Sequence, residues 1–343
     1  MPLAVQTDTT AAKARALAAE ARKAQAESAA VIRTAVLIPC FNEETAIAQV
    51  VADFRAALPD AAIYVYDNNS TDRTRQAARE AGAIVRTAAL QGKGNVMRLM
   101  FSDVDADVYL LVDGDGTYEA AAAPRLVAAL VEEGLDMVTG ARVSDVKAAY
   151  RPGHRIGNRA LTGIVRAVFG RRFSDMLSGY RVFSRRFVKS FPASSARFEV
   201  ETELTVHALQ MRLPAREIDT VYGARAEGSE SKLHTIRDGI RILRMIGLLL
   251  REERPLQFFG GCAAAAFLLA GAMNLPVVLD YMATGLVPRF PTLIVGVGLG
   301  VTGLLSLACG LILDCVARGR LEQRRFAYLA QPGPGALRWL SGS

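Results

Sequence analysis

Cysteine, histidine and tryptophan are scarce in this chain of 343 residues, which has four cysteines, three histidines and one tryptophan. The cysteines are Cys40, Cys262, Cys309 and Cys315. They lack the paired spacing of a metal site, so we expect small apolar side chains in a reducing compartment. Residues 1–30 lack the apolar core of a secretory signal, and we expect a flexible or helical arm there.

Long uncharged runs, by contrast, are present twice in the last third of the chain. The first has 25 residues between Arg254 and Asp280, and the second has 24 residues between Arg289 and Asp314. A membrane-spanning helix needs about 20 apolar residues. We therefore expect two transmembrane helices within residues 255–317, joined as a hairpin by a short loop; two buried helices of a soluble core are the alternative.

Basic residues flank these runs on the side of the two chain ends. Arg251 and Arg254 precede the first run, and Arg318, Arg320, Arg324 and Arg325 follow the second, whereas the loop offers only Arg289. The positive-inside rule then predicts a multi-pass protein of the inner membrane with both termini in the cytoplasm. Residues 318–343 would be a cytoplasmic tail.

Positive charge gathers in the middle of the chain, whose net charge is +7; residues 140–190 contain 12 Lys or Arg and two Asp. Such a patch can bind nucleic acid. The neighbouring apolar hairpin instead favours a lipid bilayer and a lipid phosphate as partners, and no nucleic acid. We expect Arg185 and Arg186 to face solvent or headgroups. Residues 156–169 have the pattern of a basic amphipathic helix, either on the membrane surface or packed on the sheet, and a juxtamembrane helix is expected within residues 233–254.

Strand and helix patterns alternate from residue 34 to residue 140. Apolar runs predict strands at 35–39, 63–67, 83–87, 108–112 and 136–139. Helical spacing predicts helices at 44–58, 71–81, 94–103 and 124–133, the second capped by Ser70 or Thr71. This order predicts an α/β, Rossmann-like and mostly parallel sheet with helices on both faces. No Gly-x-Gly-x-x-Gly follows the first strand, so the fingerprint of dinucleotide-binding enzymes is absent.

Two carboxylates end the fourth predicted strand, in the segment Val108-Tyr-Leu-Leu-Val-Asp-Gly-Asp-Gly116. Ligands of open α/β sheets bind beyond the carboxyl ends of the strands. Mg²⁺ is usually held by one or two carboxylates together with water and substrate phosphates. Asp113 and Asp115 therefore predict a site for a metal–diphosphate, with a tight polar turn as the alternative.

Several short motifs occur together and in one order. They are Ile38-Pro-Cys-Phe-Asn-Glu43, Asp67-Asn-Asn-Ser-Thr-Asp72, Gly92-Lys-Gly94, Asp113-Gly-Asp115, Ser178-Gly-Tyr-Arg181, Phe198-Glu-Val-Glu201 and the late segment from Arg225 to Lys232. Taken together, they resemble the family 2 glycosyltransferases of GT-A fold. Within that family the chain is similar to the polyprenyl-phosphate sugar transferases, the group with dolichyl-phosphate mannose synthase. The resemblance covers roughly residues 33–325 and implies a catalytic domain at residues 31–232.

The resemblance implies a role for each matching residue. Pro39, Asn42, Glu43, Asp67, Asp72, Lys93 and Asp113 would bind the nucleotide sugar. Mg²⁺ or Mn²⁺ would be held by Asp113 and Asp115. Asp115, Arg181 and Glu201 would be catalytic, with Arg181 facing the acceptor phosphate or the sugar. Arg225, Ser231 and Lys232 would bind the acceptor or the diphosphate. Where mannose synthases have a metal-binding glutamine, this chain has Gly116-Thr-Tyr118, which leaves a third ligand unassigned.

The implied activity is inverting transfer of a sugar from a nucleotide-diphosphate sugar, with UDP preferred, to a polyprenyl phosphate such as undecaprenyl phosphate. The resemblance also implies a homo-oligomer. Two alternatives stay open: another lipid-linked acceptor, or an inactive scaffold that binds nucleotide sugars. A processive polysaccharide synthase is disfavoured, since two spans are too few for a polymer tunnel and no Gln-x-x-Arg-Trp segment is present.

Overall fold

The computed structural model describes residues 32–143, 173–193, 200–223, 247–248 and 250–334. The chain divides into two compact units. We call residues 1–233 and 326–343 the sheet unit, and residues 234–325 the hairpin unit. The expected N-terminal arm, the expected helix at 156–169 and most of the expected juxtamembrane helix lie outside the described residues.

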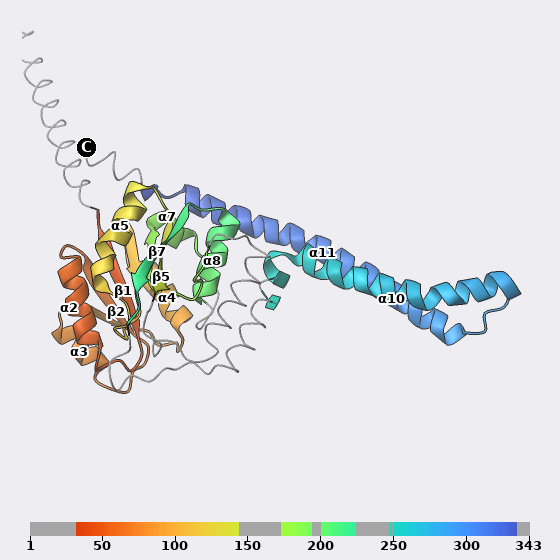
Figure 1. Ribbon diagram of the computed structural model, residues 1–343, viewed down its shortest axis with the longest axis horizontal. Coiled ribbons are helices and arrows are strands. Elements are labelled where there is room, and N and C mark those ends of the chain that lie inside the picture. The colour runs from red at the N-terminus through yellow and green to blue at the C-terminus, as the bar shows by residue number, and fades with distance from the viewer. Residues whose placement is uncertain (1–31, 144–172, 194–199, 224–246, 249, 335–343) are drawn as a thin grey trace, which may run out of the picture. The chain divides into compact units, whose positions relative to one another are not determined.

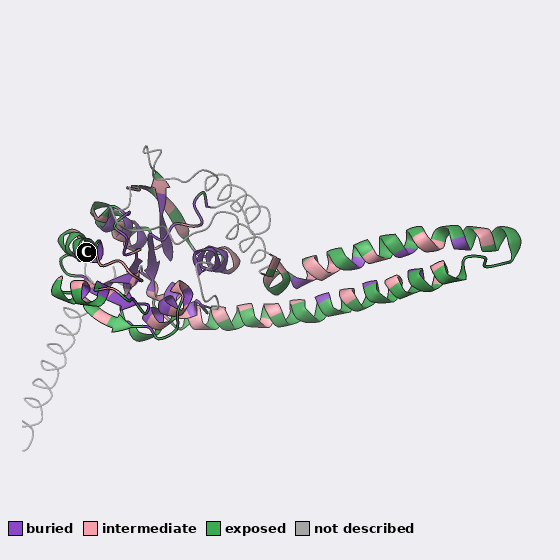
Figure 2. Cartoon of the chain, turned by 90° about the horizontal axis from the view of Figure 1, so that it is seen from below, coloured by how far each residue is buried: buried purple, intermediate pink, exposed green. Residues whose placement is uncertain are grey.

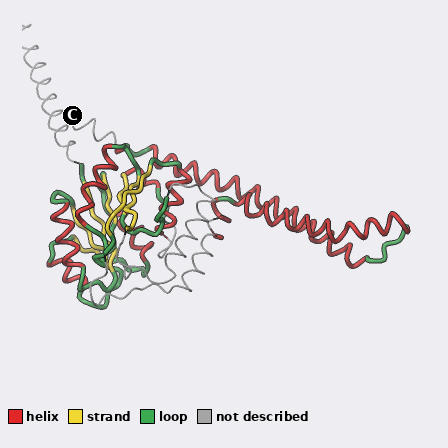
Figure 3. Tube along the Cα trace, in the orientation of Figure 1, coloured by secondary structure: helices red, strands yellow, loops and turns green. Residues whose placement is uncertain are grey.

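A seven-stranded sheet forms the centre of the sheet unit, with strand order β3-β2-β1-β4-β6-β5-β7 (Figures 1 and 3). Its strands are β1 (Thr34–Cys40), β2 (Ala62–Asp67), β3 (Ile84–Thr87), β4 (Val108–Leu111), β5 (Met137–Val143), β6 (Arg181–Ser184) and β7 (Ala215–Val221). Only β6 runs antiparallel to its neighbours, β4 and β5. The expectation of a mostly parallel sheet is confirmed.

Helices cover both faces of this sheet. They are α2 (Ile47–Ala57), α3 (Thr74–Glu80), α4 (Lys93–Asp103), the 3₁₀ turn η1 (Ala120–Ala122), α5 (Ala123–Glu132), α7 (Arg185–Ser190) and α8 (Val200–Met211). Alternate strand residues point to opposite faces. Val36 and Ile38 of β1 therefore pack in one cluster with α2 and α5. On the other face, Phe101 of α4 makes edge-to-face ring contacts with Tyr109 of β4 and Phe183 of β6.

The strands and helices expected up to residue 140 are all present, with ends that differ by a few residues. The sequence patterns missed β6 and β7. The expected side-chain cap of α3 is wrong: Arg73 is at the N-cap position without a capping side-chain bond, and the backbone N–H of Thr74 donates to Asp72 instead (3.0 Å).

The hairpin unit contains two long apolar helices, α10 (Pro255–Thr284) and most of α11 (Phe290–Leu329), joined by a short loop. Both are long and apolar enough to cross a membrane. Both helices are coloured largely as exposed or intermediate along their length in Figure 2. Their exposed residues include large apolar ones such as Leu268 and Met282. A helix with an apolar surface all round needs lipid or a protein partner, which argues against the alternative of two buried core helices.

The end of α11 belongs to the sheet unit, which includes residues from Phe326 onward. Tyr328 donates a hydrogen bond from its hydroxyl to Asp136, a fully buried carboxylate (2.9 Å). The guanidinium of Arg186 pairs with the same carboxylate and lies over the Tyr328 ring, 4.7 Å from its centroid. Arg185 pairs with Asp105 and donates to Gln331. The expectation that Arg185 and Arg186 face solvent or headgroups is therefore wrong, because both are paired within the protein.

Candidate functional site

Two loops at the carboxyl ends of β1 and β2 are tied together by hydrogen bonds. Asn42 adopts a positive φ of 53°, and its side-chain oxygen accepts from the backbone N–H of Thr71 (2.9 Å). In return, the backbone N–H groups of Asn42 and Glu43 donate to the hydroxyls of Ser70 and Thr74 (2.9 Å each). Asparagine tolerates the left-handed region that this turn requires. The Asn42 side chain thus shapes the edge of the site.

Asn68 extends this connection to the loop after β3. Its amide nitrogen donates to the carbonyl of Leu90 (2.8 Å), and its oxygen accepts from the backbone N–H of Gly92 (2.6 Å). Gly92 has a φ of 123°, a conformation that favours glycine, and α4 begins at the next residue, Lys93. The loop geometry therefore fixes where the Lys93 side chain starts.

The two acids expected to bind the nucleotide are engaged within the loop. Asp67 is fully buried, accepts from the backbone N–H of Ser70 and forms an ion pair with Arg75 at 3.6 Å. Asp72 accepts from the hydroxyl of Thr74 and from the backbone N–H of Glu44. These contacts show how both carboxylates support the loop.

Lys93 joins two carboxylates that come from distant parts of the chain. Its Nζ lies 2.5 Å from Oδ1 of Asp113 and 2.6 Å from Oε1 of Glu201. The Lys93 side chain is 8% exposed. Burial lowers the pKa of Lys93, but the charges of Asp113 and Glu201 outweigh it and raise the pKa above its usual value. Lys93 is therefore a permanent cation between the two acids.

Thr117 holds Asp115 from two residues further along the chain. The Thr117 hydroxyl and its backbone N–H both donate to Oδ1 of Asp115, at 2.6 and 3.2 Å. Asp115 is 5% exposed and Thr117 is also buried. The sequence interpretation missed Thr117, although a Ser or Thr two residues after an Asp often forms this local bond.

Glycines allow close packing around the acidic pair. A Cβ on Gly114 would lie 2.5 Å from Sγ of Cys40, and a Cβ on Gly179 would collide with the carboxylate of Asp113. The backbone N–H of Gly179 donates to the hydroxyl of Tyr118 (2.8 Å), and the hydroxyl of Ser178 donates to the carbonyl of Gly140 (2.6 Å). The Ser178-Gly179 segment therefore forms a fixed wall behind Asp113.

Arg181 lies elsewhere than expected. It is fully buried, and its guanidinium donates to the carbonyls of Ser178 (2.9 Å) and Met176 (2.6 Å) and to the hydroxyl of Thr205 (2.9 Å). Thr205 in turn donates to the carbonyl of Glu201. Since no part of Arg181 reaches the surface, an orientation toward acceptor phosphate or sugar does not fit these contacts. Arg181 instead clamps the wall behind Asp113 to the helix that carries Glu201.

Asp175 is not the main source of negative charge for Arg181, since Glu201 has the larger effect on its pKa. Asp175 instead forms a two-pronged ion pair with Arg142 (2.7 and 2.8 Å). Burial lowers the pKa of Arg181 from its usual value, and the charge of Glu201 partly offsets this effect. Glu203, two residues after Glu201 on α8, is also buried.

The acidic pair suits a cation that is shared with a substrate. In the part of the chain that the structure describes, no group of three or more His, Cys, Asp or Glu residues could hold a metal by itself. Mg²⁺ commonly takes one or two carboxylates and completes its shell with water and phosphate oxygens. Asp113, whose side chain is 31% exposed, and Asp115 fit that arrangement. The late residues Arg225, Ser231 and Lys232 lie outside the described residues.

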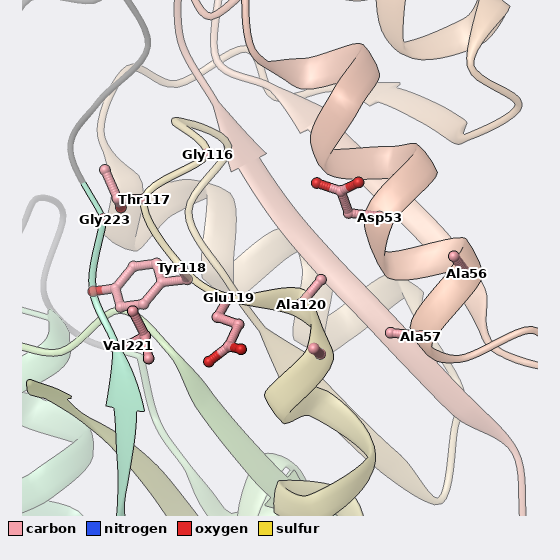
Figure 4. A pocket seen from close by; sticks show the side chains of 11 residues that line it. Asp53, Ala56, Ala57, Gly116, Thr117, Tyr118, Glu119, Ala120, Val221 and Gly223 are labelled. Carbon is pink, nitrogen blue, oxygen red and sulfur yellow. The ribbon is translucent and has the colours of Figure 1, made fainter.

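A cavity of about 580 Å³ lies beside the segment that follows the acidic pair (Figure 4). Its lining includes Thr117 and Tyr118 on one side, Asp53 of α2 on another and Val221 of β7. None of Lys93, Asp113, Asp115 and Glu201 lines it. The cavity is therefore separate from the carboxylate cluster, and the cluster is the better candidate for the chemistry.

Comparison with known proteins gives consistent matches. The model of the family described as "Glycosyl transferase family 2" matches residues 35–191. Glycosyltransferase AglJ of Haloferax volcanii is 32% identical over 296 residues, which are 84% of this chain and 95% of that protein. A dolichyl-phosphate hexose transferase of the same organism is 28% identical over 220 residues, 64% of this chain and 95% of that protein.

Solved structures share the fold of about two thirds of the chain. One is the crystal structure of glucosyl-3-phosphoglycerate synthase from Mycobacterium tuberculosis in complex with Mn²⁺ and uridine-diphosphate-glucose. It superimposes with a TM-score of 0.52 and 24% sequence identity, over 66% of this chain and 81% of that one. At this identity, the likeness shows the fold alone.

Proposed function

Because the chain belongs to the family 2 glycosyltransferases, we propose that it transfers a sugar from a nucleotide-diphosphate sugar to a polyprenyl phosphate. The product would be a polyprenyl-phosphate sugar with an inverted anomeric carbon. The reaction would take place at the cytoplasmic face of the membrane. A UDP-sugar is our preferred donor, and undecaprenyl phosphate our preferred acceptor.

One observation carries this proposal: a single chain combines a pair of acids around the buried Lys93 with two exposed apolar helices. The cluster suits a metal–diphosphate, and the helices suit a substrate that cannot leave the bilayer. An anchored enzyme meets such a lipid at a high effective concentration. The similarity to a dolichyl-phosphate hexose transferase supports a lipid phosphate as the acceptor.

The acceptor phosphate needs little activation in this reaction. A phosphate monoester has a second pKa of about 6 and carries nearly two charges at neutral pH. One of its oxygens can attack the anomeric carbon without first giving up a proton, so no general base is required. The bond from the sugar to the nucleoside diphosphate breaks on the opposite face, which inverts the configuration.

The demanding part of the reaction is the departure of the nucleoside diphosphate, which gains negative charge. Mg²⁺ or Mn²⁺ held by Asp113 and Asp115 would neutralise part of that charge when bound. Thr117 would keep Asp115 in its orientation, and Lys93 would keep Asp113 and Glu201 at a fixed separation. Arg225, Ser231 and Lys232 are proposed to bind the phosphates, while Pro39, Asn42, Glu43, Asp67 and Asp72 shape the nucleotide pocket.

The test uses the purified full chain in nanodiscs with undecaprenyl phosphate, Mn²⁺ or Mg²⁺ and a panel of nucleotide sugars. Mass spectrometry should detect a sugar-bearing undecaprenyl phosphate with at least one donor. Asp115→Asn should reduce turnover roughly 100-fold or more, because one carboxylate of the pair is lost. Asp53→Asn, an exposed acid on the separate cavity, serves as the matched control and should keep the wild-type rate.

Two results would contradict the proposal in different ways. If no donor gives a lipid-phosphate product but another lipid-linked acceptor is glycosylated, the assigned acceptor is wrong. If Asp115→Asn works as fast as the wild type, the acidic pair is not the diphosphate site. Removing divalent ions with EDTA should abolish the reaction, and adding Mn²⁺ back should restore it.

A further inference from the structure

Asp113 of the acidic pair already contacts a cation that belongs to the protein. Nζ of Lys93 lies 2.5 Å from Oδ1 of Asp113, and the Lys93 side chain is 8% exposed. The other oxygen, Oδ2, lies against the backbone of Gly179, where an added Cβ would collide with it. A metal that binds Asp113 must therefore share this carboxylate with an ammonium group that solvent hardly reaches.

Asp115 is also partly neutralised from within the protein. The Thr117 hydroxyl donates to Oδ1 of Asp115 at 2.6 Å, and the backbone N–H of Thr117 donates to the same oxygen at 3.2 Å. Hydrogen bonds to a carboxylate stabilise its charged form, so they take up part of the negative charge that a metal would otherwise bind. The acidic pair therefore attracts a free cation less strongly than two solvated carboxylates would.

Glu201 keeps Lys93 beside Asp113. Oε1 of Glu201 lies 2.6 Å from the same Nζ, and Glu201 is 4% exposed. A buried charge that loses its partner is strongly destabilising, so Lys93 does not readily leave these two acids. Glu201 thus anchors the ammonium group at the position where a metal would have to approach.

The charge of Lys93 opposes a divalent ion at Asp113. Two cations at one carboxylate repel each other, and the repulsion is weakly screened where water is largely excluded. A nucleoside diphosphate changes this balance, because its phosphates bring negative charge to both cations and also supply the oxygen ligands that Mg²⁺ prefers. The same lysine that disfavours a free metal ion is therefore compatible with a metal–diphosphate.

We propose that Lys93 prevents the acidic pair from binding a divalent ion alone, so that the donor is taken up as the metal complex of the nucleotide sugar. This inference rests on the proposed function, since it concerns the metal–diphosphate site of Asp113 and Asp115. It gives Lys93 control over the order of binding: the nucleotide-free site rejects free metal, and the nucleotide makes the site able to hold it.

Mn²⁺ binding to the full chain in detergent tests the inference, because the electron paramagnetic resonance signal of free Mn²⁺ reports binding without any turnover. We expect the wild type to bind Mn²⁺ at least tenfold more tightly with saturating UDP than without it. Lys93→Met removes the ammonium group and keeps much of the side-chain volume. It should bind Mn²⁺ alone tenfold or more tightly than the wild type does.

Three further variants isolate the charge at position 93. Lys93→Arg keeps a cation there and should bind Mn²⁺ alone within about threefold of the wild type. Lys189→Met is the matched control, because Nζ of Lys189 donates to the carbonyls of Phe101 and Val104 instead, and it should keep the wild-type affinity. Asp113→Asn added to Lys93→Met should abolish the gain, since the ion is expected at Asp113.

The stability of Lys93→Met is measured as well, because Asp113 and Glu201 lose the cation that they share. A ligand that binds only the folded state raises the melting temperature. Mn²⁺ alone should therefore raise the melting temperature of Lys93→Met, whereas the wild type should need Mn²⁺ together with UDP. Failure of Mn²⁺ to stabilise Lys93→Met would contradict the inference.

The inference is also overturned if the wild type binds Mn²⁺ equally well with and without UDP, if Lys93→Met gains no affinity, or if Lys93→Arg gains as much as Lys93→Met. The lipid transfer assay separates these results from the proposed function. Transfer by the wild type without a gain of affinity in Lys93→Met would sustain the proposed function and overturn the inference. The expected affinities without any lipid product would support the inference and contradict the proposed acceptor.

Discussion

Gly179 lies directly against the carboxylate of Asp113, and a Cβ at this glycine would be 2.9 Å from Cγ of Asp113 and closer still to Oδ2. Gly179→Ala must therefore push Asp113 or the wall behind it out of place. Displacement of a reacting group by about 1 Å can cost on the order of 100-fold in rate. We expect at least a tenfold loss of turnover in the lipid transfer assay.

Gly223→Ala is the matched control for this substitution, because its nearest neighbour would be the Thr117 carbonyl at 3.8 Å, an ordinary contact. It should retain the wild-type rate. Full activity of Gly179→Ala would show that Asp113 does not need the position seen here.

Arg181→Met tests whether the Arg181 hydrogen bonds hold the Ser178-Gly179 segment to α8. Methionine fills much of the volume but leaves the carbonyls of Ser178 and Met176 and the hydroxyl of Thr205 without their donor. Unsatisfied buried groups cost about 1–3 kcal/mol each, so we expect the melting temperature to fall by several degrees. Turnover should also fall at a temperature where the variant is still folded, since both Glu201 and Asp113 depend on the clamp.

Arg125→Lys provides the comparison, since Arg125 is an exposed arginine that donates to one carbonyl, that of Asp219. It should melt within about a degree of the wild type. A wild-type melting temperature in Arg181→Met would contradict the stabilising role of the Arg181 hydrogen bonds.

The local sequence patterns were sufficient for the first half of the fold. β1 and β4 are apolar runs that are buried on both faces, and α2 repeats Ile47, Val50, Val51 and Phe54 on one side. β6 was not predicted because it has only four residues and begins with an arginine. β7 pairs with β5 alone, at the edge of the sheet, and its consecutive charged residues Arg216 and Glu217 break the alternation that marks a strand. The position of β7 in the sheet depends on its pairing with β5, which is distant in the sequence.

The site residues also divide into those that local sequence patterns predict and those that only the tertiary fold reveals. Asp113 and Asp115 could be found because two carboxylates follow one strand. The role of Arg181 could not, since a short motif does not reveal whether an arginine faces a ligand or the interior. Its direction is set by β6, which runs between β4 and β5 and turns the guanidinium toward α8. Likewise, only the tertiary fold brings Glu201 to Lys93.

The acid at the start of α3 gives a prediction for pH. Burial raises the pKa of Asp72, but hydrogen bonds from the hydroxyl and N–H of Thr74 and the N–H of Glu44 outweigh it and lower the pKa. Ionised Asp72 therefore stabilises the fold above its unfolded pKa of about 3.9, and this stability is lost as pH falls through the lowered value. Asp72→Asn should lower the melting temperature by a few degrees at pH 7.

The difference between Asp72→Asn and the wild type should shrink below pH 4 and vanish near the lowered pKa, when the acid itself is neutral. Paired melting curves from pH 7 downward measure it. A difference in melting temperature that stays constant over this pH range would mean that the charge of Asp72 contributes nothing to the stability of the fold.

The contact between Tyr328 and Asp136 holds the last turn of α11 within the sheet unit. Tyr328→Phe removes one donor from a buried carboxylate that keeps Arg186 and Ser184 as partners, which should cost about 1 kcal/mol. Tyr328→Ala should cost more, since the ring beneath Arg186 is lost as well. Limited proteolysis should cut both variants faster near residues 330–334. Tyr281→Phe, at an exposed tyrosine of α10, should be cut at the wild-type rate.

The two apolar helices meet along residues that repeat every seventh position, Gly296, Gly303 and Gly310 on α11 and Ala263, Ala270 and Val277 on α10. Small residues let helix backbones approach closely in a membrane, where packing replaces the hydrophobic effect. A Cβ at Gly303 would be 2.9 Å from the ring of Phe267. Gly303→Leu should therefore separate the helices and destabilise the hairpin by about 1–3 kcal/mol.

Gly300→Leu is a stringent control for Gly303→Leu, because it lies on the same helix, adds the same side chain and has nothing within 4 Å of the new Cβ. Unfolding by SDS titration in mixed micelles compares the two variants. We expect an earlier transition for Gly303→Leu and a wild-type transition for Gly300→Leu, since leucine at position 300 meets no neighbouring atom. Equal transitions in the two variants would mean that the seven-residue repeat does not hold the helices together.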